Sequence, residues 1–231
     1  MNNCIILHLY YQELWPEFKK YLKEIVDEKN HLYVSVCRTD TPWYEDIKSL
    51  AKEVYVLKNK GFDFGPFVYI YSKIKDMDYQ NIVKLHGKKS VHTPGLADTW
   101  RPELYMNLIG NRNLYHNLMQ QIASEESIYM VNVQKYFIRE TKDSANYIAI
   151  DKYLDRLCEI MKVKKHDEGL FFAGSMFVCS KKYLDLLFEK TDLEELYLAF
   201  EDGYQQVSLA HAMERVIGFN VHDFGGTYAI I

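Results

Sequence analysis

The first ninety residues alternate between short apolar runs and amphipathic stretches. Runs rich in β-branched residues predict strands, and apolar residues at helical spacing predict the helices between them. The predicted strands cover residues 4–9, 32–36, 53–57 and 82–85, and the predicted helices cover 13–29, 42–52 and 67–74. Strands that alternate with helices in this way predict a parallel sheet with helices on both faces and right-handed crossovers.

The second half of the chain is less regular. Helical spacing predicts helices over residues 102–109, 114–123, 151–163, 181–188 and 207–217, and residues 128–133 should be extended. Residues 171–178 predict one strand, interrupted by the small residues Ala173, Gly174 and Ser175. Small side chains at that point allow the close approach of either a ligand or a packed helix.

Composition narrows the class of protein. A chain of 231 residues with 48% hydrophobic residues can bury a core as one domain. The net charge of −4 argues against a nucleic-acid partner, because such binding depends on a basic face. The four cysteines have neither zinc-site nor disulfide spacing, and no apolar run is long enough for a signal peptide or a membrane span. These features predict a cytoplasmic protein.

A cationic cluster follows the fourth predicted strand. His86, Lys88, Lys89 and Ser90 place an imidazole, two ammonium groups and a hydroxyl within five residues. Ligands of open α/β sheets bind beyond the carboxyl ends of the strands, so these groups could bind a diphosphate. Gly87 should permit a turn that a Cβ would obstruct. The alternative is a solvated lysine pair at a strand end.

Asp76-Met77-Asp78 matches the short DxD string with which two carboxylates can chelate a divalent metal. The string precedes the fourth strand, where Asp is an ordinary turn residue, so we interpret it as a turn. A metal site would be expected after that strand. Cations there could take over the role of a metal in stabilising a leaving diphosphate.

Candidate catalytic groups stand near the last predicted helix. Glu201 or Asp202 could deprotonate an acceptor hydroxyl, although acidic residues also cap helix starts. His211 lies on the same helical face as Ser208 and Arg215, where it is either catalytic or simply packed. GxSxG, Walker and HExxH motifs are missing from the sequence, which excludes the commonest hydrolase and nucleotidase signatures.

Several separated motifs resemble the rhamnan synthesis protein F family of bacterial cell-surface polysaccharide enzymes. They are HLYY at 8–11 with LWP at 14–16, NKGFDFGPF at 59–67, VKLHGKKS at 83–90, WR at 100–101, FAGSMF at 172–177 and LAHAMER at 209–215. These motifs follow one another in order through nearly the whole chain. The family is similar to GT-A glycosyltransferases, which implies a GT-A-like three-layer α/β/α sandwich with a mainly parallel central sheet.

The resemblance also implies roles for individual residues. Residues 1–90 would form the nucleotide-sugar-binding half and residues 91–231 the acceptor and catalytic half of a single domain, 1–231. The implied nucleotide-binding residues are His8, Tyr10, Asn59 and Asp63; the diphosphate-binding residues are His86, Lys88, Lys89 and Ser90; the acceptor-binding residues are Gly174, Ser175 and Arg215; and the catalytic candidates are Asp202, Glu201 and His211. One departure leaves the catalytic base open, because Gln206-Val207-Ser208 stands where the family usually has Asp-Gly-Thr.

The function implied is transfer of a hexose or deoxyhexose from a nucleoside diphosphate to a polysaccharide or lipid-linked glycan. No cofactor is firmly predicted; a divalent metal stays an option, but no DxD stands at the expected position. The expected place of action is the cytoplasm, or the inner face of the membrane if the acceptor is membrane-bound. The alternative is a non-catalytic GT-A-like module that binds a sugar or nucleotide. A nucleotidyltransferase would need a glycine-rich loop after the first strand, which HLYY does not provide.

Overall fold

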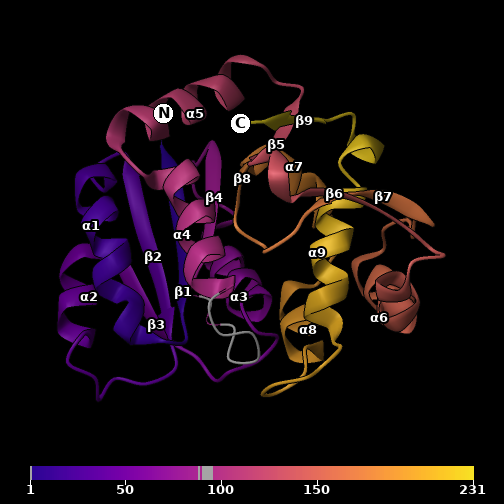
Figure 1. Cartoon of the computed structure of the whole chain (residues 1–231), viewed down its shortest axis with the longest axis horizontal. Coiled ribbons are helices and arrows are strands. Elements are labelled where there is room, and N and C mark those ends of the chain that lie inside the picture. The colour runs from indigo at the N-terminus through magenta and orange to yellow at the C-terminus, as the bar shows by residue number, and fades with distance from the viewer. Residues whose placement is uncertain (1, 88, 90–95) are drawn as a thin grey trace.

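The computed structural model describes residues 2–87, 89 and 96–231, without the side chains of 96–101. In this part of the chain the central sheet has seven strands in the order β3-β2-β1-β4-β8-β5-β9 (Figure 1). The strands are β1 (Asn3–Leu9), β2 (Asn30–Val36), β3 (Glu53–Val56), β4 (Asn81–His86), β5 (Ile128–Asn132), β8 (Phe177–Ser180) and β9 (Thr227–Ile230). β8 runs antiparallel to both neighbours, and the other pairs are parallel.

Helices cover both faces of the sheet because the inner strands β1, β2, β4 and β5 are buried on both sides. One face carries α1 (Trp15–Ile25), α2 (Tyr44–Leu50), α4 (Leu96–Ile109) and α5 (Arg112–Ser124). The core on the other face includes α3 (Phe64–Ile74), α6 (Ala145–Met161), α7 (Lys181–Leu187), α8 (Leu193–Ala199) and α9 (Leu209–Phe219), with α8 packed on α3 and α6 packed on α9. Along β1, Ile5 and Leu7 join the first core, whereas Cys4 and Ile6 join the second. The predicted three-layer α/β/α sandwich with a mainly parallel sheet is confirmed.

The prediction of one interrupted strand over residues 171–178 is wrong. The chain forms two strands there, which belong to different sheets. β7 (Glu168–Phe172) pairs with β6 (Phe137–Thr141) in a separate two-stranded sheet, whereas β8 joins the central sheet. The turn between them passes through backbone with positive φ at Gly174 (94°) and Ser175 (54°), a conformation that ends the first strand. β6, α8 and β9 were not predicted from the sequence.

The reason given for Gly87 is wrong as well. Its φ does not lie in the left-handed region, so the backbone conformation there does not require glycine. A Cβ at this position would meet Leu14 Cδ1 at 3.3 Å and Leu9 Cδ2 at 3.4 Å. The constraint is therefore tight side-chain packing at the start of the loop after β4.

Strand register brings three polar side chains into a row at the carboxyl ends of β2, β1 and β4. Ser35 lies opposite His8, and His8 lies opposite His86. Side chains alternate along a strand, so these residues share the sheet face that is covered by α3. Asp76 and Asp78 lie at the other end of β4, in an exposed turn after α3. The polar row therefore marks the end of the sheet where a site can form.

Short 3-10 helices at Gln12–Leu14, Gln134–Tyr136 and His222–Phe224 complete the elements. Among the residues that the structure describes, none of the helices combines the length and hydropathy needed to cross a bilayer.

Candidate functional site

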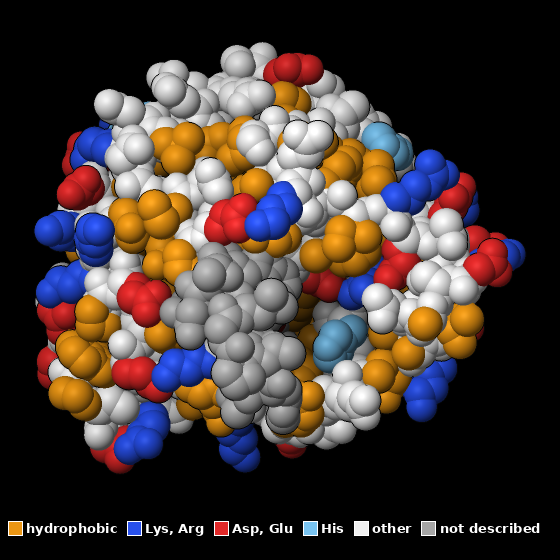
Figure 2. Space-filling model, viewed as in Figure 1, with side chains coloured by type: hydrophobic (Ala, Val, Ile, Leu, Met, Phe, Trp, Pro, Cys, Tyr) orange, Lys and Arg blue, Asp and Glu red, His pale blue; other side chains and the backbone are white. Residues whose placement is uncertain are grey.

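A cavity of about 460 Å³ opens at the carboxyl ends of β1 and β4. One wall comes from these strand ends and the loop before α3, and the opposite wall comes from α9 and the loop that precedes it. Figure 2 shows a hollow on this face of the molecule, bordered by apolar and charged side chains and by a histidine. The two walls belong to distant parts of the sequence, which the fold brings together.

His8 lies in the floor of the cavity as a neutral imidazole. Its Nδ1 is 2.9 Å from the Ser35 hydroxyl, and only 5% of the residue is exposed. The pKa of His8 is lowered to about 3, mainly by burial; Asp63 opposes this shift, whereas His86 and Lys84 add to it. At neutral pH this residue is therefore a hydrogen-bonding group without charge.

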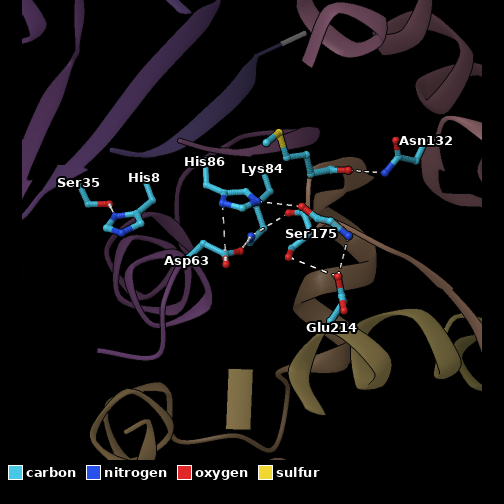
Figure 3. A network of polar contacts seen from close by, with 10 residues as sticks. His8, Ser35, Asp63, Lys84, His86, Asn132, Ser175 and Glu214 are labelled. Carbon is cyan, nitrogen blue, oxygen red and sulfur yellow. Dashed lines mark hydrogen bonds and ion pairs between the residues drawn. The ribbon is translucent and has the colours of Figure 1, made fainter. Parts of the chain in front are cut away.

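A buried ion pair joins Lys84 of β4 to Asp63 at the start of α3 (Figure 3). The Lys84 ammonium also donates to the carbonyl of Ser175 at 2.8 Å and lies 4.1 Å from the centre of the Phe64 ring. A buried ammonium needs such partners, because removing its hydration costs several kcal/mol. Lys84 thus connects the strand, the α3 loop and the β7–β8 turn.

His86 extends this network toward the same turn. Its Nε2 lies 2.8 Å from the carbonyl oxygen of Gly174, and its Nδ1 lies 4.0 Å from Asp63 Oδ1. A carbonyl oxygen only accepts, so the hydrogen of this bond sits on Nε2. Burial favours the neutral form of Asp63, but the nearby His86 and Lys84 outweigh burial and hold the pKa of Asp63 below its ordinary value. Asp63 is therefore a carboxylate.

The opposite wall is held by a chain of charges that begins at Glu214 of α9. Glu214 Oε1 accepts from the Gly174 backbone N–H at 2.8 Å, and its Oε2 accepts from Arg215 at 2.6 Å. Arg215 in turn binds the buried Glu140 of β6 with Nε at 2.9 Å. The turn that receives His86 and Lys84 is therefore anchored to α9 and, through Arg215, to the two-stranded sheet.

Most of the predicted site residues that can be placed are brought to this cavity. Those that line it are His8, Tyr10, Asn59, Asp63, His86, Lys89, Ser175 and His211. The Lys89 ammonium is 2.6 Å from Glu13 Oε1 and 5.1 Å from the centre of the Tyr11 ring. Lys88 and Ser90 lie outside the described residues. The functional roles of all these residues stay predictions.

Four predicted residues do not line the cavity in the described part of the chain. Glu201 accepts from the Leu209 N–H at 3.1 Å and caps α9, and the side chain of Asp202 is 77% exposed beside Lys60. Gly174 reaches the site only through its backbone, and the Arg215 guanidinium lies behind Glu214. Of the three catalytic candidates, His211 is thus the one on the cavity wall.

Two groups of the site were missed from the sequence. Lys84 interrupts a strand that is otherwise apolar up to His86, and a lone lysine between buried apolar residues signals a buried partner. Glu214 stands three residues after His211, which places both on one side of a helix. Both signals were present in the sequence, but it did not identify the groups at the cavity that these residues bind: Asp63 and the Ser175 carbonyl for Lys84, and the Gly174 N–H for Glu214.

The cavity does not offer an obvious metal-binding arrangement. In the described portion of the chain, no group of three or more His, Cys, Asp or Glu residues could hold a metal ion. The carboxylate of Asp63 is already bound to Lys84.

Fold and cavity together define a three-layer α/β protein with a cavity at the carboxyl ends of its parallel strands, lined by polar and aromatic side chains. The chain belongs to the rhamnan synthesis protein F family, whose sequence model matches residues 1–225.

Curated relatives include the uncharacterized protein WxcX from two strains of Xanthomonas campestris pv. campestris. Each is 27% identical over 235 residues, which cover 96% of this chain and 32% of the relative. The chain therefore spans about a third of the length of these relatives. Among solved structures, core-mannan synthase A from Aspergillus fumigatus in its Mn/GDP form is similar, with a TM-score of 0.43 and 8% identity over 99% of this chain and 73% of that one. This likeness is too distant to support an inference about the site.

Proposed function

We propose that this chain is a GT-A-like glycosyltransferase of polysaccharide biosynthesis, which moves a sugar from a nucleoside diphosphate to a glycan acceptor. The carrying observation is the cavity at the carboxyl ends of β1 and β4, with imidazole and ammonium groups on one wall and His211 on the other. Membership of the rhamnan synthesis protein F family supports the polysaccharide context. The donor would bind the first wall and the acceptor would enter along the second.

On the donor side, Lys89 supplies a cation at the start of the loop after β4. We assign the diphosphate to this loop, with Lys88 and Ser90 as further contacts, and the nucleoside to Tyr10, Asn59 and the floor around His8. At an effective dielectric constant of about 20, one cation about 4 Å from a phosphate contributes roughly 4 kcal/mol before desolvation is subtracted. This attraction would grow as the leaving diphosphate gains charge.

On the acceptor side, we assign proton removal to His211. Its Nδ1 lies 3.0 Å from the Ser208 hydroxyl, a contact that orients the imidazole. Glu201 is occupied as the cap of α9, and Asp202 is paired with Lys60 outside the cavity lining. A histidine is a suitable base for a sugar hydroxyl near neutral pH.

Donor binding can be tested by thermal shift against a panel of nucleotide sugars, with and without a chelator. A bound donor should raise the melting temperature by mass action, and the chelator shows whether a metal takes part. Lys88→Ala and Lys89→Ala should lower both this shift and sugar transfer. Unchanged turnover in the double variant would refute the diphosphate role of the loop.

The base can be tested by comparing His211→Ala with Asp202→Asn. We expect His211→Ala to lower the transfer rate by about 100-fold or more while donor binding survives, the loss typical of a general base. Asp202→Asn serves as the matched control and should keep nearly full activity. The reverse result would move the base to Asp202. Donor binding by the unaltered protein with neither transfer nor donor hydrolysis would instead favour the non-catalytic module.

A further inference from the structure

Two loops that are far apart in the sequence form one preassembled lip of the cavity. They are the loop before α3, residues 59–63, and the loop before α9, residues 200–208. The Gly61 N–H donates to the Glu201 carbonyl at 2.9 Å, and the Gly203 N–H donates to the Asn59 carbonyl at 2.8 Å. These two hydrogen bonds form an isolated antiparallel β-bridge centred on Lys60 and Asp202. Backbone hydrogen bonds therefore hold the two loops in fixed positions relative to each other, and the side chains of the lip project from this fixed backbone.

The lip carries a set of aromatic rings at the cavity mouth. Tyr204 is 65% exposed and meets the Phe62 ring edge to face, with centroids 5.9 Å apart. Phe62 meets the His211 ring at 5.7 Å in the same manner. Phe62 also has a left-handed backbone, with φ 50°, which is rare for a bulky side chain and is found where a loop clamps a ligand.

The strand ends and the lip differ in the charge of the side chains that line the cavity. The wall formed by the strand ends has Lys89 beside Tyr11, which suits an anionic ligand. On the lip, none of the described residues that line the cavity is Lys or Arg; the lining groups are Asn59, Phe62, Asp63, Tyr204 and Gln205, and the Asp63 carboxylate is paired with Lys84. An exposed aromatic ring next to the Gln205 amide suits a neutral sugar, whose C–H face packs on the ring while a hydroxyl bonds to the amide.

We propose that this lip is the acceptor subsite and that it binds a neutral pyranose of the glycan, with the ring of Tyr204 as the stacking surface and Gln205 as a hydrogen-bonding partner. The inference rests on the proposed transferase function and adds the chemical class of its acceptor. It also explains why His211 lies next to this aromatic set, because the sugar hydroxyl that reacts would be delivered to it.

The test measures sugar binding directly, without turnover. A rhamnose trisaccharide is the neutral probe, and a trisaccharide containing glucuronate is the acidic comparison. Binding is followed by saturation-transfer NMR and calorimetry, and UDP, GDP and dTDP are titrated in parallel. Tyr204→Ala should weaken binding of the neutral probe by about five- to tenfold, the loss expected for one aromatic contact, and Tyr204→Phe should keep it. Nucleotide binding should stay unchanged in both variants.

Two control variants separate the walls. Tyr10→Ala alters the opposite wall and should affect nucleotide binding rather than trisaccharide binding. Leu198→Ala alters an exposed residue of α8 that does not line the cavity, and it should affect neither.

Several results would overturn the subsite. The first is that Tyr204→Ala binds the neutral trisaccharide as tightly as the wild type does. The second is that the same variant binds nucleotides more weakly, and the third is that the wild type prefers the acidic trisaccharide. Absence of trisaccharide binding by the wild type would overturn it as well. Transfer activity is measured separately from binding. If the wild type transfers sugar and Tyr204→Ala does not weaken binding of the neutral trisaccharide, the subsite alone is refuted. A protein that binds the neutral probe through Tyr204 without transfer refutes the transferase alone.

Discussion

Two lysine–aspartate pairs lie at opposite ends of the short loop before α3, and they differ mainly in exposure. Lys84 and Asp63 have side chains that are 1% and 12% exposed, and they form the core of the polar network under the cavity. The side chains of Lys60 and Asp202 are 16% and 77% exposed, and they meet at 3.4 Å at the outer edge. Both aspartates were candidate site residues, yet they lie in unlike surroundings.

The difference shows that burial, rather than the pairing itself, sets the importance of these charges. A partner removed from a buried pair leaves an unhydrated charge, whereas a partner removed from an exposed pair is replaced by water. The buried pair also connects to Ser175 and, through Asp63, to His86. The exposed pair adds only to a contact between two loops that backbone hydrogen bonds already hold together.

The largest expected effect is that of Asp63→Asn. We expect it to lower the free energy of unfolding by about 3 to 5 kcal/mol, because the Lys84 ammonium stays buried without a countercharge. Urea denaturation followed by circular dichroism measures the loss. Lys84→Met in the same background should recover part of it. If Asp63→Asn were as stable as the wild type, the buried pair would not have the importance assigned to it here.

The next effect is a loss of stability in acid that depends on His8. The folded pKa of His8 is about 3, below its unfolded value near 6.5, so the unfolded chain binds an extra proton between these values. Stability should therefore fall as the pH drops below about 6.5, by about 3 kcal/mol at pH 4. His8→Asn removes this titration, and its unfolding free energy should depend less on pH. Equal slopes for both proteins would contradict the prediction.

Two glycines near these ion pairs, Gly65 in the first turn of α3 and Gly203 in the loop before α9, differ in the space available for a Cβ. A Cβ at Gly65 would lie 1.9 Å from the Lys60 carbonyl oxygen, whereas a Cβ at Gly203 would meet nothing within 4 Å. Gly65→Ala should therefore cost about 2 to 3 kcal/mol by displacing backbone. Gly203→Ala should cost about 1 kcal/mol, because φ 69° is unfavourable for alanine even in open space. Thermal unfolding of both variants tests the ranking, which equal costs would refute.

The smallest expected effect is that of Asp202→Asn on stability. An exposed ion pair contributes less than about 1 kcal/mol and is screened by salt. The variant and the wild type should thus unfold at nearly the same urea concentration, and the small difference should vanish in concentrated salt. A loss as large as that of Asp63→Asn would mean that exposure does not separate the two pairs.

Local pattern was sufficient for much of the architecture. The four strands and three helices of the first ninety residues were predicted, because short apolar runs mark buried strands and helical spacing marks the buried side of each helix. Prediction was poorer after residue 124, where β6, α8 and β9 were missed and β7 and β8 were merged. The merged strand looked continuous because Phe171, Phe172 and Phe177 are all buried, although they belong to two different sheets.

The position of His86 and Lys89 at the cavity could also be expected from sequence, since His86 ends a buried strand in an α/β order and Lys89 follows it. Which groups meet there was decided by tertiary structure. Strand register sets His8 between Ser35 and His86, and the packing of two loops about 140 residues apart buries Asp63 while it leaves Asp202 in solvent. The physical reason is that a side chain's hydration and its partners depend on segments far away in the chain, and no local pattern records them.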